Sequence, residues 1–248
     1  MKPNSLMQLI AMPKATPAVR ILIFINVVLF LLDRVLPYRM TEIFGLYLPA
    51  NDKYAVWQYL TGMFMHHGLG HLIINMAGLF FFGRIVERAL GTKRFVTLYA
   101  LAGIGSGIIF TLVQSYEYSA GVALTNAIES GAQALASNET YQKTVYMLAR
   151  MYRTEVVGAS GALYGVLAAV AMLFPNAKVS LKFIPFPIVA KYFVLGLVGI
   201  DLVLQVTGLA PFGRFMVAHS AHLGGALIGF LLMLYWRYCF PKHPQRNK

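Results

Sequence analysis

The chain has 248 residues, of which 58% are hydrophobic and 12% are charged. This share of charge is too small to surround a soluble core of such apolarity, which excludes an ordinary soluble domain and indicates an integral membrane protein. The formal net charge of +12 at pH 7 is of a size seen in nucleic-acid-binding proteins, but here it follows a membrane topology.

Six apolar segments have a length that crosses a lipid bilayer, which takes roughly 17 to 25 mainly apolar residues. In chain order they are residues 18–36, 69–90, 95–114, 157–174, 188–207 and 218–240. The sequence therefore predicts an all-α, polytopic protein with one membrane domain of six helices over residues 18–240. An N-terminal segment, residues 1–17, precedes this domain, and a basic tail, residues 241–248, follows it.

The placement of charge predicts the topology. With the N-terminus inside, the inner segments are basic with Glu87 as their only acid, whereas the outer loops are near neutral. This is the pattern of the positive-inside rule, so both termini are expected in the cytoplasm. The basic inner face then needs no nucleic acid and no partner beyond anionic lipid headgroups. The absence of an extra helix or long presequence favours a bacterial inner membrane.

Two long segments separate the apolar runs on the outer side. Residues 37–64 are rich in aromatic side chains, which suits a segment lying at the level of the headgroups. Residues 115–155 are Ala-rich and polar, with apolar positions at helical spacing. We expect this extended outer loop to form one or two surface helices that cap the membrane face or bind a partner.

The stretch VVGASGALYG, residues 156–165, places Ser160 at the start of an apolar run that ends before Pro175. About fifteen helical residues rise only ~22 Å, which is too short to cross a bilayer core of ~30 Å. If the inner end of this helix lies at the inner surface, Ser160 lies in a water-accessible pocket below the outer surface. The free N–H groups of a helix N-terminus suit a developing oxyanion there. Taken alone, however, Ser160 is better explained as a helix cap.

A nucleophilic serine needs a base, and His222 is the best candidate. Two G-x-x-x-G pairs allow the helices that carry these residues to approach closely in lipid, which would bring His222 within hydrogen-bond reach of Ser160. The pairs are Gly161 with Gly165 and Gly225 with Gly229. His71 and Asn75 share a third helical face at the same outer level, where their N–H groups would stabilise an oxyanion. The alternative is that both are buried hydrogen-bonding residues.

Three patterns together resemble the rhomboid family of intramembrane serine proteases. They are GASG at residues 158–161, AHLGG at residues 221–225, and the pair His71 and Asn75. The resemblance runs from about Arg20 to Tyr238. It implies a bundle of six transmembrane helices around a short central helix that carries the serine.

The same resemblance implies the roles of single residues. Ser160 would be the nucleophile and His222 the general base of a two-residue catalytic unit. The residues that would support the active site are His71 and Asn75 at the oxyanion, Tyr164 stacked near His222, and Gly158. The residues with a structural role would be His66 in the first outer loop, Glu87, Gly161, Gly165, Gly225 and Gly229.

The function implied by the resemblance is that of a serine endopeptidase, which cleaves transmembrane segments of other membrane proteins through an acyl-enzyme. The substrate helix would enter sideways near the second and fifth helices and unwind locally. Neither a metal nor an organic cofactor is required.

Two positions need separate comment. The family's Trp-Arg pair in the first outer loop is Trp57-Gln58 here, so the contacts of that arginine are expected to be lost. Asp201, in the fifth apolar run, could orient His222 as a third catalytic residue. Because the family works without such a residue, a structural hydrogen bond or a pore-lining role is favoured.

Two other functions are considered. The first is a metal site or metal transporter built from the outer histidines His66, His67, His71, His219 and His222. It is disfavoured because the chain lacks the Glu of an H-E-x-x-H pattern and paired carboxylates in the spans. The second is a non-proteolytic rhomboid-like protein that binds membrane clients. The presence of both Ser160 and His222 argues against it.

Overall fold

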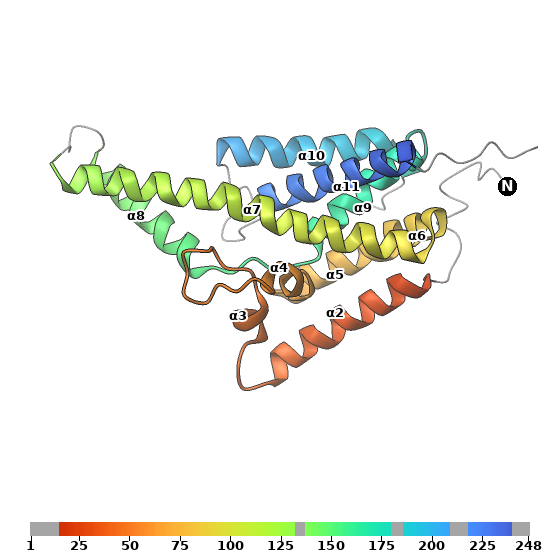
Figure 1. Ribbon diagram of the computed structural model, residues 1–248, viewed down its shortest axis with the longest axis horizontal. Coiled ribbons are helices and arrows are strands. Elements are labelled where there is room, and N and C mark those ends of the chain that lie inside the picture. The colour runs from red at the N-terminus through yellow and green to blue at the C-terminus, as the bar shows by residue number, and fades with distance from the viewer. Residues whose placement is uncertain (1–14, 132–136, 180–185, 209–217, 240–248) are drawn as a thin grey trace, which may run out of the picture.

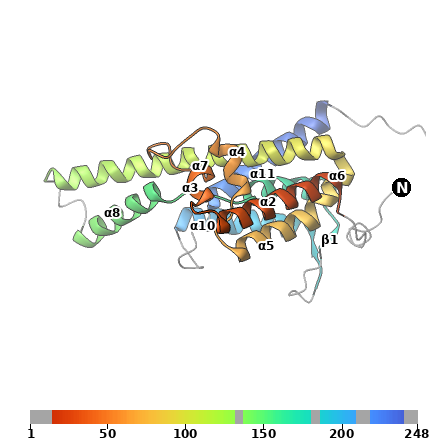
Figure 2. The same ribbon diagram turned by 90° about the horizontal axis from the view of Figure 1, so that it is seen from below.

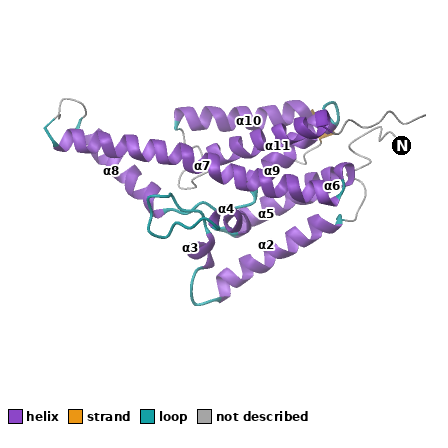
Figure 3. Cartoon of the chain, in the orientation of Figure 1, coloured by secondary structure: helices purple, strands orange, loops and turns teal. Residues whose placement is uncertain are grey.

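The computed structural model of the protein describes residues 15–131, 137–179, 186–208 and 218–239. These residues are mostly helical (Figure 3), with connecting loops and an antiparallel pairing of β1 (Lys178–Val179) with β2 (Ile188–Val189). Most of the expected N-terminal segment 1–17 lies outside the described residues, as do the tail 241–248 and residues 209–217 of the last outer loop.

The helices follow the apolar segments of the sequence. In chain order they are α2 (Pro17–Val35), α3 (Met40–Phe44), α4 (Gln58–Thr61), η1 (Gly62–Phe64), α5 (Leu69–Gly78), η2 (Leu79–Gly83), α6 (Arg84–Leu90), α7 (Thr92–Glu129), α8 (Asn138–Arg153), α9 (Ser160–Leu173), α10 (Ala190–Thr207) and α11 (His219–Cys239). The elements α5, η2 and α6 form one continuous helical span. Gly91 joins this span to α7 with a φ of +80°, a conformation that glycine adopts without steric cost.

Three of these helical spans are long and apolar enough to cross a membrane, judged by length and composition in the described part of the chain. They are Leu69–Leu90, Thr92–Glu129 and Ala190–Thr207. The helix α2 has a similar length but carries Arg20, Asp33 and Arg34, and α11 carries two histidines and Arg237. An integral membrane protein is therefore supported, while the expected count of six spans is reached only if α2, α9 and α11 are included.

The short helix α9 lies at the centre of the helical bundle, with α7 and α11 against it (Figure 1). Nine of its 14 residues are buried. Val166, Ala169 and Val170 join a core cluster that also contains Phe95 and Leu98 of α7. This cluster encloses α9. Because Ser160 is the first residue of α9, the surrounding helices determine where Ser160 lies.

Glu87 connects three helices at one end of the bundle. Its carboxylate accepts hydrogen bonds from the backbone N–H groups of Ala18 and Val19 at 3.0 and 3.1 Å, in the first turn of α2. It also accepts from the hydroxyl of Thr16, before α2, and from that of Thr92 at 2.8 Å, the first residue of α7. A single buried carboxylate thus satisfies the free donors at the start of α2 and fixes that helix to α6 and α7.

The outer segment 115–155 differs from expectation in its first half. Residues 115–129 do not form a separate surface helix but continue α7, whose 38 residues span about 57 Å. The helix α8 returns beside this extension (Figure 1 and Figure 2), with Tyr152 stacked on Tyr118 at 6.5 Å between ring centroids. No residue of α8 is buried. The segment is therefore a projecting helical hairpin.

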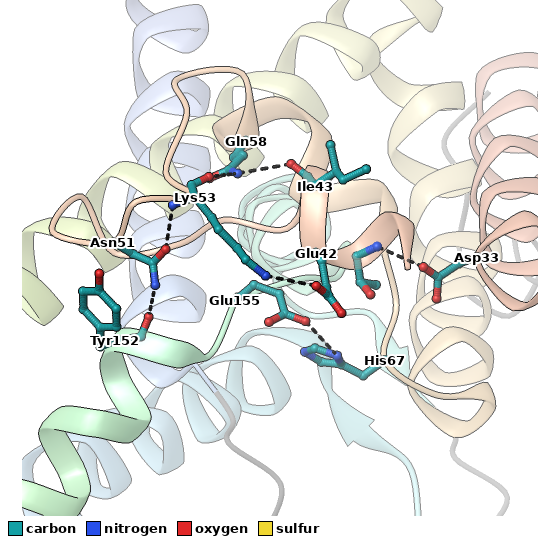
Figure 4. Close-up of polar contacts among 10 residues, drawn as sticks. Asp33, Glu42, Ile43, Asn51, Lys53, Gln58, His67, Tyr152 and Glu155 are labelled. Atoms are coloured by element: carbon teal, nitrogen blue, oxygen red, sulfur yellow. Dashed lines mark hydrogen bonds and ion pairs between the residues drawn. The ribbon is translucent and has the colours of Figure 1, made fainter. Parts of the chain in front are cut away.

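The first outer loop is held by Gln58, which stands where the resemblance implies an arginine. Gln58 is buried (Figure 4), and its side-chain oxygen accepts hydrogen bonds from two backbone N–H groups not labelled in that view, those of Tyr47 at 3.3 Å and Ala55 at 3.1 Å. Its amide nitrogen donates to the carbonyls of Ile43 at 3.2 Å and Lys53 at 2.8 Å. The glutamine therefore closes the loop with four neutral hydrogen bonds.

The same loop supports residues 156–158, the segment that leads to Ser160. Leu46 and Val156 exchange backbone hydrogen bonds of 2.9 and 2.8 Å, and the N–H of Gly158 donates to the carbonyl of Gly62 at 3.0 Å. Figure 4 shows this chain, near Glu155, lying beside the loop that carries Glu42 and Lys53. The approach to Ser160 is thus fixed by backbone pairing.

Candidate active site

Ser160 and His222 lie within hydrogen-bond distance of each other. Ser160 is the first residue of α9, and His222 is in the first turn of α11. The Nε2 atom of His222 is 2.9 Å from the Oγ atom of Ser160. The two side chains therefore have the separation that a serine nucleophile and its base require.

The glycine pairs explain why α9 and α11 approach so closely. A Cβ atom added at Gly225 would overlap the carbonyl group of Gly161, and one added at Gly229 would overlap the backbone of Gly165. The two G-x-x-x-G faces are therefore in direct backbone contact, and a side chain at Gly225 or Gly229 would push α11, which carries His222, away from α9.

The ring of Tyr164, one turn after Ser160, stacks on the ring of His222. The ring centroids are 4.3 Å apart and the planes differ by 12°. This contact covers one face of the imidazole and restricts its rotation.

His71 and Asn75 lie against Gly158, two residues before Ser160. Gly158 has a φ of +118°, and a Cβ atom at this position would lie 2.6 Å from Nε2 of His71 and 3.7 Å from Nδ2 of Asn75. Only glycine allows both side chains to approach the chain here. The Nδ2 group of Asn75 donates one hydrogen bond to the carbonyl of His71 at 3.0 Å, which leaves a second N–H available.

His66 was expected to support the first outer loop and lies next to the same group. It is buried, and its ring meets the ring of His71 edge to face, with 5.0 Å between centroids. Burial, and to a lesser degree the neighbouring His71, lowers the pKa of His66 to about 3. His66 is therefore neutral at pH 7.

Asp201 of α10 contacts the other side of His222. The Nδ1 atom of His222 is 3.2 Å from both carboxylate oxygens of Asp201. The same carboxylate contacts Nδ1 of His219 and the hydroxyl of Tyr164. From the sequence, His219 is a candidate only in the metal-site alternative. Its spacing of three residues from His222 on one helix was the signal that both could contact one group.

The residues best placed to hold a metal ion, among those described, are Asp201, His219 and His222, whose ligand atoms all lie within 4.8 Å of one another. Two imidazoles and a carboxylate are a donor set that zinc accepts. The three groups also satisfy one another through hydrogen bonds, and Nε2 of His222 faces Ser160. The arrangement therefore needs no ion to explain it.

Comparison with known proteins places these residues in a family context. The model of the Rhomboid domain matches residues 53–239. The chain is 29% identical over 169 residues to RHOMBOID-like protein 12, mitochondrial, of Arabidopsis thaliana (68% of this chain, 43% of that protein). It is 30% identical over 181 residues to Rhomboid protease AarA of Providencia stuartii (72% and 55%).

A third relative is named as inactive. Inactive RHOMBOID-like protein 8 of Arabidopsis thaliana is 32% identical over 105 residues (41% of this chain, 30% of that protein). The chain spans about half the length of the first two relatives. Since the family model covers most of the chain, including Ser160 and His222, the protein belongs to the rhomboid family.

Proposed function

We propose that the protein is an intramembrane serine endopeptidase that cleaves transmembrane segments of other membrane proteins. The observation that carries this proposal is the 2.9 Å separation of Ser160 Oγ and His222 Nε2 at the N-terminus of the enclosed helix α9. A capping role alone does not account for this geometry, because the Ser160 hydroxyl is paired with an imidazole from another helix.

In the proposed reaction, His222 Nε2 takes the proton of Ser160 Oγ as that oxygen forms a bond to the scissile carbonyl carbon. The oxyanion would be stabilised by the backbone N–H of Ser160 and by the N–H groups of His71 and Asn75. His222 then returns the proton to the leaving amine as the C–N bond breaks. A water molecule then attacks the acyl-enzyme, with His222 Nε2 taking its proton and returning it to Ser160 Oγ as the ester bond breaks.

Substrate access is proposed to occur beside α10. Of its 18 residues, only Ala190, Val194 and Asp201 are buried, so most of its surface would face lipid. The family resemblance implies that the substrate enters sideways near this helix and the span formed by α5, η2 and α6. A substrate helix must unwind before attack because its peptide carbonyls are hydrogen-bonded within the helix.

We also propose six membrane spans with both termini on the inner side, following the charge asymmetry of the loops. The relatives include a mitochondrial protein and a bacterial one. They do not support the bacterial inner membrane that the sequence favours.

A second candidate function is client binding without cleavage, and the inactive relative is the observation that favours it. The two functions differ in what Ser160 does. In a client-binding protein, the contact between Ser160 and His222 would be structural, and removing the hydroxyl would leave client binding intact.

The test is incubation of the detergent-purified protein with a reporter protein that has one transmembrane helix, with the products sized by mass spectrometry. Cleavage within or beside that helix is expected, and Ser160→Ala and His222→Ala should each abolish it. Matched controls are Ser119→Ala, an exposed serine on α7, and His67→Ala, a half-exposed histidine of the outer loop. Intact reporter with every variant, together with no labelling of Ser160 by a fluorophosphonate, would leave client binding as the function.

A further inference from the structure

We propose that Asp201 positions the general base, so that the active site works as a triad of Ser160, His222 and Asp201. This inference rests on the proposed protease function. It goes beyond the two-residue catalytic unit that the family resemblance implies.

The donor and acceptor roles follow from the chemistry of the groups. An ionised carboxylate only accepts hydrogen bonds, so the Nδ1 atom of His222, 3.2 Å from both oxygens of Asp201, must carry the proton. The Nε2 atom then has a free lone pair directed at Ser160 Oγ, 2.9 Å away. Asp201 thus selects the tautomer of His222 that can act as a base.

The remaining contacts of Asp201 hold the carboxylate in place. Tyr164 donates its hydroxyl to one oxygen, and the Nδ1 group of His219 donates to the other. A carboxylate has about four lone-pair sites. Tyr164 and His219 each contact one oxygen and His222 contacts both, so the four contacts match these sites. Tyr164 also stacks on the His222 ring. The orientation of the His222 imidazole is therefore fixed by Tyr164 at the ring face and by Asp201 at Nδ1.

The position of Asp201 in α10 is difficult to explain without this role. Its neighbours Ile200, Leu202 and Val203 are 59%, 52% and 56% exposed on a helix that is mostly lipid-facing, whereas Asp201 is 4% exposed. A carboxylate at membrane depth is costly unless it is paired, and such residues are usually functional. All three partners of Asp201 in the described structure lie on α9 and α11, within one turn of Ser160 or His222.

Asp201 does not take a proton during the reaction. The proton of Ser160 passes to Nε2 of His222 as the Oγ–C bond forms, and from Nε2 to the leaving amine as the C–N bond breaks. The Nδ1 proton stays on His222 throughout, and the ionised carboxylate stabilises the imidazolium that forms in between.

The principal competing explanation is that Asp201 only fastens α10 to the bundle. Gln205 provides the matched control, because it lies one turn further along α10 and donates a hydrogen bond to Glu117 of α7 at 3.0 Å. Gln205→Ala removes a polar tether of α10 without touching His222. Asp201→Asn keeps the size of the side chain but removes its charge.

The experiment measures kcat, KM and thermal unfolding of the wild type, Asp201→Asn, Asp201→Glu and Gln205→Ala with the same reporter. For Asp201→Asn, we expect kcat to fall about 100-fold or more with KM changed less than about threefold, as for loss of the acid in other serine triads. Asp201→Glu should retain a higher kcat than Asp201→Asn, since it keeps a carboxylate. Gln205→Ala should keep kcat within about twofold, as expected for a residue outside the reacting unit.

Three results would overturn the assignment. They are equal kcat values for Asp201→Asn and Gln205→Ala, a Glu variant no more active than the Asn variant, and loss of wild-type activity with a chelator, which would make the three groups metal ligands. Ser160→Ala in the same assay keeps the two proposals apart. If it abolishes cleavage while Asp201→Asn does not, only the triad fails; if it has no effect, the protease function itself fails.

Discussion

Gly229 of α11 packs directly on Gly165 of α9, and a side chain at Gly229 would separate the two helices that carry His222 and Ser160. A Cβ atom at Gly229 would lie 2.6 Å from the carbonyl oxygen of Gly165 and 2.9 Å from its carbonyl carbon. Backbone atoms cannot move aside as a flexible side chain can. This contact therefore links the packing of the bundle to the geometry of the active site.

Gly229→Ala should lower both stability and activity. Forcing a methyl group into a close-packed contact costs about 1–3 kcal/mol of unfolding free energy, and the helix separation it causes would lengthen the distance from His222 to Ser160. Thermal unfolding and reporter cleavage measure the two effects. Gly199→Ala on α10 is the control, since a Cβ there meets nothing within 4 Å. Equal behaviour of the two alanine variants would contradict the proposed role of the glycine contact.

Glu87→Ala should destabilise the protein without changing the active site. The carboxylate accepts from Ala18, Val19 and Thr92 at the ends of α2 and α7. Removing it leaves buried N–H donors unsatisfied, which should cost about 2 kcal/mol or more. The matched variant is Glu139→Ala, which removes an exposed carboxylate from the first turn of α8 and should cost less than about 0.5 kcal/mol. A melting temperature lowered equally by both would argue against the capping role.

The sequence predicted the helices near the site well, because the length of each apolar run and the placement of small residues within it are local properties of the sequence. The run 188–207 became α10, Ala190–Thr207, and the run 157–174 became α9, Ser160–Leu173. The spacing of the glycines predicted a close approach of two helices, and the structure has this approach. These features depend on periodicity and size, which a single sequence contains.

Other features depend on how distant segments meet. Residues 115–129 are helical in either interpretation, so their composition could not show that they extend α7. The hydrogen bonds of Gln58 exist only once the loop around it has closed. The contact of Asp201 with His222 depends on the rotation of α10 about its axis. A helix with apolar residues all around carries little information on that rotation.

His66 should make the protein less stable in acid. Its folded-state pKa of about 3 is below the ordinary value of 6.5, so the unfolded chain binds the proton first. The stability that neutral His66 contributes is fully present above pH 6.5 and is lost as the pH falls toward about 3. Among the neighbouring titratable groups, His71 and, to a lesser degree, His67 also lower the pKa of His66.

The measurement is the melting temperature in detergent over this pH range, compared with His66→Gln, which cannot gain the proton. The wild type should lose more stability than His66→Gln as the pH falls. His67→Gln, at a half-exposed ion pair with Glu155, is the control and should follow the wild type. Parallel curves for the wild type and His66→Gln would show that protonation of His66 does not oppose folding.

Gln58→Ala should open the first outer loop while leaving the helices folded. The change leaves the N–H groups of Tyr47 and Ala55 and the carbonyls of Ile43 and Lys53 without their partner. Each backbone N–H group left unpaired costs about 1–3 kcal/mol, so amide exchange of Tyr47 and Ala55 should become about tenfold faster or more. Hydrogen–deuterium exchange of peptides from the loop measures this, with α11 as the internal reference.

Gln58→Arg restores the residue that the family has at this position and separates two explanations of the loop. Arginine donates hydrogen bonds but cannot accept them, so the N–H groups of Tyr47 and Ala55 would stay unpaired and exchange should remain fast. Asp52→Asn is the control, because its exposed side chain accepts a hydrogen bond from the hydroxyl of Tyr152 at 3.3 Å, and Tyr152 is not one of the partners of Gln58 named above. Slow exchange in Gln58→Arg would mean that charge at this position, rather than the acceptor oxygen of glutamine, is enough to close the loop over the chain that leads to Ser160.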